Sequence, residues 1–171
     1  MSAQPPPEVA RPVSLRDRIQ IDIATAMRGG DALRRDVLRM ALNAAYNVEK
    51  KQGTPLTDDE YIAVLTREVK TRRESVDAFR AAGREDLATK EESEIAILRD
   101  YLPEALGEAE LKALVEEGIK ATGAANARDL GKVMGWLSPR TRGRADGKVM
   151  SGMVAAALAQ ADLAGHDVGT H

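Results

Sequence analysis

Apolar residues recur at intervals of three and four along most of the chain, which is the spacing of amphipathic helices. In the first part of the chain, this spacing predicts four helices, over 14–28, 31–52, 57–82 and 84–101. Beyond them, shorter stretches with the same spacing predict three helices, over 108–121, 127–137 and 146–161. No segment shows the clear alternation of apolar and polar residues that is typical of a strand. The sequence therefore predicts an all-α fold.

Residues that start and stop helices divide this pattern into two parts. Residues 57–60 form a capping box, in which Thr57 caps the third helix and Glu60 reaches back to it. Pro103 ends the fourth helix, and the next helix begins only after Gly107. We therefore expect an N-terminal helical domain of about four helices, followed by a small three-helix tail domain. The expected ranges are a disordered Pro-rich arm over 1–13, the two domains over 14–103 and 104–162, and a frayed tail over 163–171.

The stretch from Asn126 to Lys148 is basic. It carries six Lys or Arg residues and two Asp residues, a net charge of +4, whereas the whole chain has −2. Pro139 disfavours the helical conformation at Ser138, so we expect a helix to end there and a basic loop to follow. The loop holds Arg140, Arg142 and Arg144. Such a patch indicates an anionic partner, most often phosphate. The alternative is a solvated loop whose arginines pair with nearby carboxylates.

Three side chains on the helix before this loop are spaced four residues apart. They are Arg128, Lys132 and Trp136. This spacing places them in one stripe that points toward the arginine loop. Trp136 is the only tryptophan, and it has two interpretations: partial burial in a small core, or stacking on a base or a sugar.

The helix over 57–82 carries a second group of basic residues. Its candidate binding side chains are Lys70, Arg72 and Arg73, and we expect them to form a secondary basic face. The alternative is a solvated face whose charge is balanced by acidic residues on the same helix. These acidic residues are Glu68, Glu74 and Asp77.

Composition disfavours several kinds of chemistry. The chain has no cysteine, so it has no disulfide, thiolate nucleophile or cysteine-based zinc site. Its two histidines, His166 and His171, both fall in the predicted frayed tail, and no nucleotide-binding or metalloprotease motif is present. The acidic residues Glu91, Glu92 and Glu94 are interpreted as a solvated helix face. We therefore expect no catalytic residue, metal or cofactor in the isolated chain.

The chain also lacks the run of roughly 20 apolar residues that a membrane-spanning helix needs. Its first residues hold four of the seven prolines and no apolar core, which is not the pattern of a signal peptide. The absence of cysteine fits a reducing compartment. We therefore expect a cytoplasmic protein with no membrane partner.

Five short segments, taken in this order along the chain, resemble the GatB/YqeY family. They are AGREDLA at 82–88, ESEI at 92–95, YLP at 101–103, GKVMG at 131–135 and GRADGK at 143–148. The resemblance extends over roughly 15–158 and is to the free-standing YqeY-like proteins, because the chain is far too short to hold the amidotransferase domain of GatB. It implies an all-helical fold of two parts. It also implies kinship with the tail of the B subunit of the tRNA-dependent amidotransferase, which contacts tRNA, and with a module of some glutaminyl-tRNA synthetases.

This resemblance implies a basic surface on the tail domain, at Lys132, Arg142, Arg144 and Lys148. We therefore expect a non-catalytic accessory module that binds tRNA by shape and phosphate rather than by base sequence, and that does not bind DNA. The alternative is a protein-interaction module that docks on an aminoacyl-tRNA synthetase or an amidotransferase through the N-terminal domain. A third interpretation follows the family label, a carbon–nitrogen ligase with glutamine as amido-N-donor, with activity only inside a complex.

Overall fold

The computed structural model describes residues 12–166, and every regular element in this range is helical. The all-α prediction is therefore confirmed. In chain order the elements are α1 (Leu15–Gly29), α2 (Ala32–Gln52), α3 (Asp58–Ala81), α4 (Glu85–Arg99), α5 (Glu108–Thr122), the 3₁₀ helix η1 (Ala127–Asp129), α6 (Leu130–Thr141) and α7 (Gly147–His166). The arm predicted over 1–13 lies almost entirely outside the described residues.

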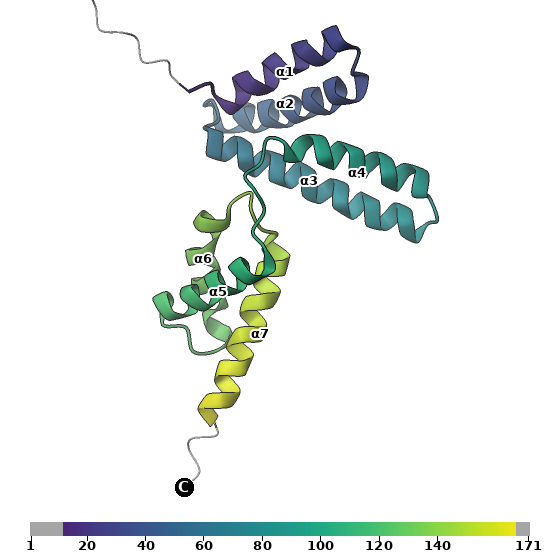
Figure 1. Cartoon of the computed structure of the whole chain (residues 1–171). Coiled ribbons are helices and arrows are strands. Elements are labelled where there is room, and N and C mark those ends of the chain that lie inside the picture. Colours follow the sequence, from purple (N-terminus) through teal and green to yellow (C-terminus); the bar gives the residue numbers. More distant parts are fainter. Residues whose placement is uncertain (1–11, 167–171) are drawn as a thin grey trace, which may run out of the picture.

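The first four helices form two hairpins that pack on each other, α1 with α2 and α3 with α4 (Figure 1). Their shared core consists of apolar side chains from all four helices, and its fully buried members include Ile19, Val37, Leu38, Leu65 and Leu98. The predicted capping box is present at the start of α3. The Thr57 hydroxyl accepts a hydrogen bond from the Glu60 N–H, and the Glu60 carboxylate accepts one from the Thr57 N–H.

The helix predicted to reach Tyr101 ends at Arg99, and Tyr101 instead joins the end of α4 to the first hairpin. Its hydroxyl donates a hydrogen bond to the Asp22 carboxylate and accepts one from the Arg34 guanidinium at 3.2 Å. Arg18 lies over its ring, 4.8 Å from the centroid. This buried aromatic side chain therefore fixes the start of the segment that leads to α5.

The last three helices form a separate bundle with its own core (Figure 1). Four of its side chains are completely buried, namely Val133, Leu137, Val154 and Leu158. Among the described residues, no helix of α1–α4 packs against a helix of α5–α7. A non-helical segment therefore lies on at least one side of the contact between the two groups. The last helix also extends to His166, so the first residues of the tail predicted to be frayed are helical.

Pro139 does not end a helix, contrary to the prediction from its sequence. It lies inside α6, which continues to Thr141. Proline has no N–H group, so it removes one helical hydrogen bond, and in the last turn little of the helix remains to be interrupted. Three side chains nearby donate to carbonyls one turn back and secure this turn. They are Ser138 to Met134 at 2.7 Å, Arg140 to Trp136 at 2.7 Å, and Thr141 to Leu137 at 3.0 Å. Arg140 is consequently a helix residue rather than a loop residue.

Candidate nucleic-acid interface

The loop after α6 is seated against the rest of the protein through Gly143. This residue has a φ of 73°, in the left-handed region that favours glycine. A Cβ atom placed on it would lie 2.5 Å from Cγ2 of Ile62 on α3 and 3.1 Å from Cδ of Pro103. Such distances leave no room for a side chain. The loop therefore touches both α3 and the segment between α4 and α5.

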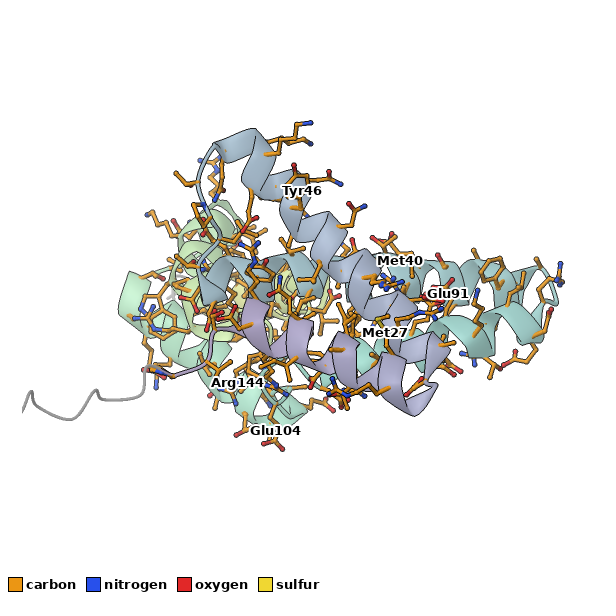
Figure 2. The ribbon with its side chains drawn as sticks, turned by 90° about the horizontal axis from the view of Figure 1, so that it is seen from above. Met27, Met40, Tyr46, Glu91, Glu104 and Arg144 are labelled. Carbon is orange, nitrogen blue, oxygen red and sulfur yellow. The ribbon has the colours of Figure 1, made fainter. Side chains whose placement is uncertain are left out.

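Arg144 continues this contact and is half-buried. Its carbonyl oxygen accepts a hydrogen bond from the Leu106 N–H at 2.8 Å, and its Nε donates to the Glu104 carbonyl oxygen at 3.0 Å (Figure 2). One of the three predicted loop arginines thus holds the segment between α4 and α5 in place. It is not a freely solvated cation.

The predicted stripe on α6 contains one more residue than expected, because the helix continues past Pro139. Arg128, Lys132, Trp136 and Arg140 follow one another at intervals of one turn over η1 and α6. The Arg140 guanidinium lies 3.8 Å from the centre of the Trp136 ring, in cation–π geometry. Lys132 pairs with Asp129 at 3.0 Å but keeps 68% of its side chain exposed.

Trp136 is half-buried and packs against α5. A Cβ atom at Gly118 would lie 3.0 Å from Cε3 of its ring, so the glycine allows the indole to pack closely on α5. One part of the ring therefore belongs to the tail core, which agrees with the interpretation of Trp136 as partly buried in a small core. The Arg140 guanidinium lies over the ring as well, so a stacking base would have to share or displace it.

Arg142 and Lys148 are exposed, as is Arg128. Within residues 12–166, none of the three side chains forms a hydrogen bond or an ion pair. The positive charge of Arg142 helps to lower the pKa of Glu60, although the main cause of that shift is the hydrogen bond from the Thr57 N–H. The alternative in which the loop arginines pair with carboxylates therefore does not describe Arg142.

A groove of about 430 Å³ lies where the loop meets α3. Its lining comes from three segments that are distant in the sequence, at 66–73, 99–106 and 143–149, together with Leu111 of α5. Four of its lining side chains are basic, namely Lys70, Arg73, Arg99 and Arg144. The structure thus brings two residues of the secondary basic face together with one residue of the loop.

Arg72, the third residue predicted for the secondary basic face, does not belong to it. It is 8% exposed and faces α4. Its Nε lies 3.0 Å from the carboxylate of Glu94 on α4, and its Nη1 lies 2.8 Å from the carboxylate of Glu68 on α3. Glu94 is 7% exposed, so it is not part of a solvated acidic face as predicted. Buried charges need partners, and these three residues satisfy one another. Glu68 is therefore paired with a buried arginine and does not balance the exposed Lys70.

The predicted residues consequently fall into two groups. Arg128, Lys132, Trp136 and Arg140 lie along η1 and α6, whereas Lys70, Arg73 and Arg144 line the groove. Arg142 and Lys148 are not among the groove-lining residues. Sequence reasoning missed Arg99, whose place in the last turn of α4 has an ordinary explanation as a charge that complements the helix dipole.

The described part of the chain lacks two kinds of feature, a metal-binding cluster and a membrane-spanning helix. No group of three or more His, Cys, Asp or Glu side chains there is arranged to hold a metal ion. No helix there is both long enough and apolar enough to cross a membrane.

Comparison with known proteins identifies the family. Residues 16–158 match the family model described as Yqey-like protein. The chain is 29% identical over 130 residues to "Altered inheritance of mitochondria protein 41, mitochondrial" from Pyrenophora tritici-repentis, covering 75% of this chain and 71% of that protein. It is 27% identical over 140 residues to the protein of the same name from Lachancea thermotolerans, covering 78% and 75%. A shorter match of 55 residues, 46% identical, is to an uncharacterized protein of Schizosaccharomyces pombe, covering 32% and 45%. The extent of the family match, which includes all five segments quoted above, places this chain in the YqeY-like family.

Proposed function

We propose that this protein is an accessory tRNA-binding module and that its RNA surface is formed by η1, α6 and the start of α7. The observation that carries the proposal is a stripe of cations with one half-buried tryptophan along η1 and α6, followed by the exposed Arg142 and Lys148, on a chain whose net charge is −2. Arg128, Arg142 and Lys148 make no ion pair in the described residues, so their charge is available to phosphates. The resemblance to the tail of the tRNA-dependent amidotransferase supports tRNA as the nucleic acid.

The proposed contact is with the outside of folded tRNA. The surface offers point charges and one partly accessible aromatic edge, which suit phosphate and sugar contacts better than base-edge readout. Such contacts position the RNA without specifying its sequence. Binding should therefore depend strongly on salt and weakly on the identity of the tRNA.

The experiment is to replace Arg128, Arg142 and Lys148 together with Gln and to measure tRNA binding by filter retention at several salt concentrations. If all three reach phosphates, the slope of log K against log salt should shrink by about 2 to 3, at roughly 0.7 to 0.9 per lost contact. The matched control replaces Arg28, Arg39 and Arg84 with Gln. These three are exposed and belong to α1, α2 and the turn between α3 and α4, outside the proposed surface. An unchanged slope in the first variant, or an equal change in the control, would reject this surface.

The enzymatic alternative is kept as a proposal for a complex alone. No catalytic residue is proposed in this chain, and glutamine-dependent amidation would require a partner that supplies it. An assay of glutaminase and amidation activity with candidate partner subunits tests this interpretation. Turnover by the purified chain alone would contradict the accessory role.

The cytoplasmic location stays a prediction. The names of two relatives include the word mitochondrial, so the mitochondrion is the alternative location. Imaging of the full chain with a C-terminal fluorescent tag, beside a mitochondrial marker, distinguishes the two.

A further inference from the structure

The groove between α3, the segment after α4 and the loop after α6 is lined by none of the three cations assigned to tRNA above, Arg128, Arg142 and Lys148. Its cations come from both sides of the contact between the two helix groups. Lys70 and Arg73 lie one turn apart on α3, Arg99 is in the last turn of α4, and Arg144 is in the loop. A ligand in the groove would therefore contact residues that only the folded chain brings together.

The groove has positive charge that the described part of the protein does not neutralise. Lys70, Arg73 and Arg99 form no hydrogen bond or ion pair through their side chains within residues 12–166. Two acidic residues also line the groove. One of them, Asp146, is directed to the start of α7, where its Oδ1 accepts hydrogen bonds from the N–H groups of Lys148 at 2.8 Å and Val149 at 3.2 Å. Its charge is thus partly taken up by the helix N-terminus.

The groove is lined mainly by apolar side chains. Val69 and Leu111 are buried, Leu102, Pro103 and Leu106 are half-buried, and Val149 is 54% exposed. Ligand sites typically combine such an apolar lining with a few polar groups that fix orientation, in volumes of roughly 300 to 1,000 Å³. A ligand that matches this lining carries apolar groups as well as negative charge.

Nucleic acid matches the groove less well than a peptide. No aromatic side chain lines it, so unpaired bases would find nothing on which to stack. A sugar-phosphate backbone would use the cations but not the apolar residues. Carboxylate side chains next to Leu, Ile, Val or Phe would use both.

We propose that this groove binds a short acidic segment of a partner protein, in which carboxylates contact Lys70, Arg73 and Arg99 and apolar side chains occupy the lining. The proposal is independent of tRNA binding. It also places the protein contact at the junction of the two helix groups, where α3 and α4 supply Lys70, Arg73 and Arg99 and the loop after α6 supplies Arg144.

The test uses a library of random twelve-residue peptides displayed on phage and selected on the full chain. Enriched peptides are synthesised with a fluorescent label, and their dissociation constants are measured by polarisation. We expect enrichment of Asp or Glu together with large apolar residues. In the Arg73→Gln, Arg99→Gln variant, affinity should fall by about tenfold or more, since each lost charged hydrogen bond has an effect of that order.

Two further variants make the result specific. Val149→Asp places a negative charge on the apolar rim and should also weaken binding, whereas Arg67→Gln, on an exposed α3 residue outside the groove lining, should not. Circular dichroism confirms that each variant is folded. A library with no enriched peptide, or peptides that bind the Arg73→Gln, Arg99→Gln variant as tightly as the wild type, would overturn the proposal. So would a twelve-nucleotide oligouridylate that binds more tightly than any peptide and loses affinity in that variant.

Discussion

Replacing Gly143 with Ala should destabilise the protein through two separable effects. The backbone has a φ of 73°, and an L-residue in this left-handed region costs roughly 1 to 2 kcal/mol. The new Cβ would also lie 2.5 Å from Cγ2 of Ile62 and 3.1 Å from Cδ of Pro103. Forcing an extra carbon into such a contact typically costs about 1 to 3 kcal/mol. The free energy of unfolding should therefore fall by roughly 2 to 5 kcal/mol.

The matched control is Gly123→Ala, in the same tail bundle. Gly123 has a φ of 65°, but a Cβ there would meet no atom within 4 Å, so only the backbone cost applies. Urea unfolding of both variants, followed by the helical circular dichroism signal, gives the two free energies. The amount by which Gly143→Ala lowers the free energy of unfolding more than Gly123→Ala does measures how closely the loop packs against its neighbours.

A second substitution tests whether Ile62 is the neighbour responsible. Ile62→Ala removes Cγ2, so Gly143→Ala should cost less in that background, with a coupling energy of about 0.5 to 3 kcal/mol. If Gly143→Ala and Gly123→Ala destabilise equally, and Ile62→Ala does not change the effect, the loop does not pack against α3 in solution. The groove described above would then lose its basis as well.

Three further predictions concern single side chains. Arg72→Gln leaves the buried Glu94 without its main partner and should lower the free energy of unfolding by about 3 to 5 kcal/mol in urea, and Arg72→Met with Glu94→Leu should recover much of that loss. Burial, and then the hydrogen bond to Asp22, raise the pKa of Tyr101 from 10 to about 12. The folded state thus holds this proton more tightly, and the resulting stability is complete below pH 10 and lost as pH rises toward 12. Urea midpoints across this range should fall less for Tyr101→Phe than for the wild type. Because Trp136 is the only tryptophan, titration with tRNA should change the intrinsic fluorescence of the wild type. No change at saturating tRNA would place the RNA elsewhere.

The helices and their caps could be predicted from the sequence because they depend on residues that are close together in the chain. The capping box at Thr57 depends on residues three positions apart, and the chain alone supplies both partners. Pro139 shows the limit of local rules, because α6 continues through it to Thr141 and side chains on both sides of it donate to carbonyls of the preceding turn. Sequence spacing predicts Arg128, Lys132 and Trp136 in one stripe, and in the structure they follow one another along η1 and α6.

The groove and the buried ion pair could not be predicted from the sequence, because their residues are far apart in the chain. Arg72 and Glu94 lie 22 positions apart, and only the packing of α3 on α4 shows that they form a pair. Arg99 and Arg73 likewise become neighbours of Arg144 only when the loop and the segment after α4 meet. An exposed lysine and a buried arginine on one helix look alike in sequence, because both interrupt an apolar pattern with positive charge.

The contact between the two helix groups is small. Because the segment that connects them is short, this contact is enough to hold them together. A segment of eight residues, 100–107, joins α4 to α5. Short tethers hold two parts at effective concentrations on the order of millimolar, so even weak contacts keep them together. A substitution at Gly143 or Arg144 that changes the free energy of this contact by about 1.4 kcal/mol alters the ratio of docked to undocked molecules about tenfold. The groove exists only in docked molecules, so its availability is governed by a few atoms in one loop.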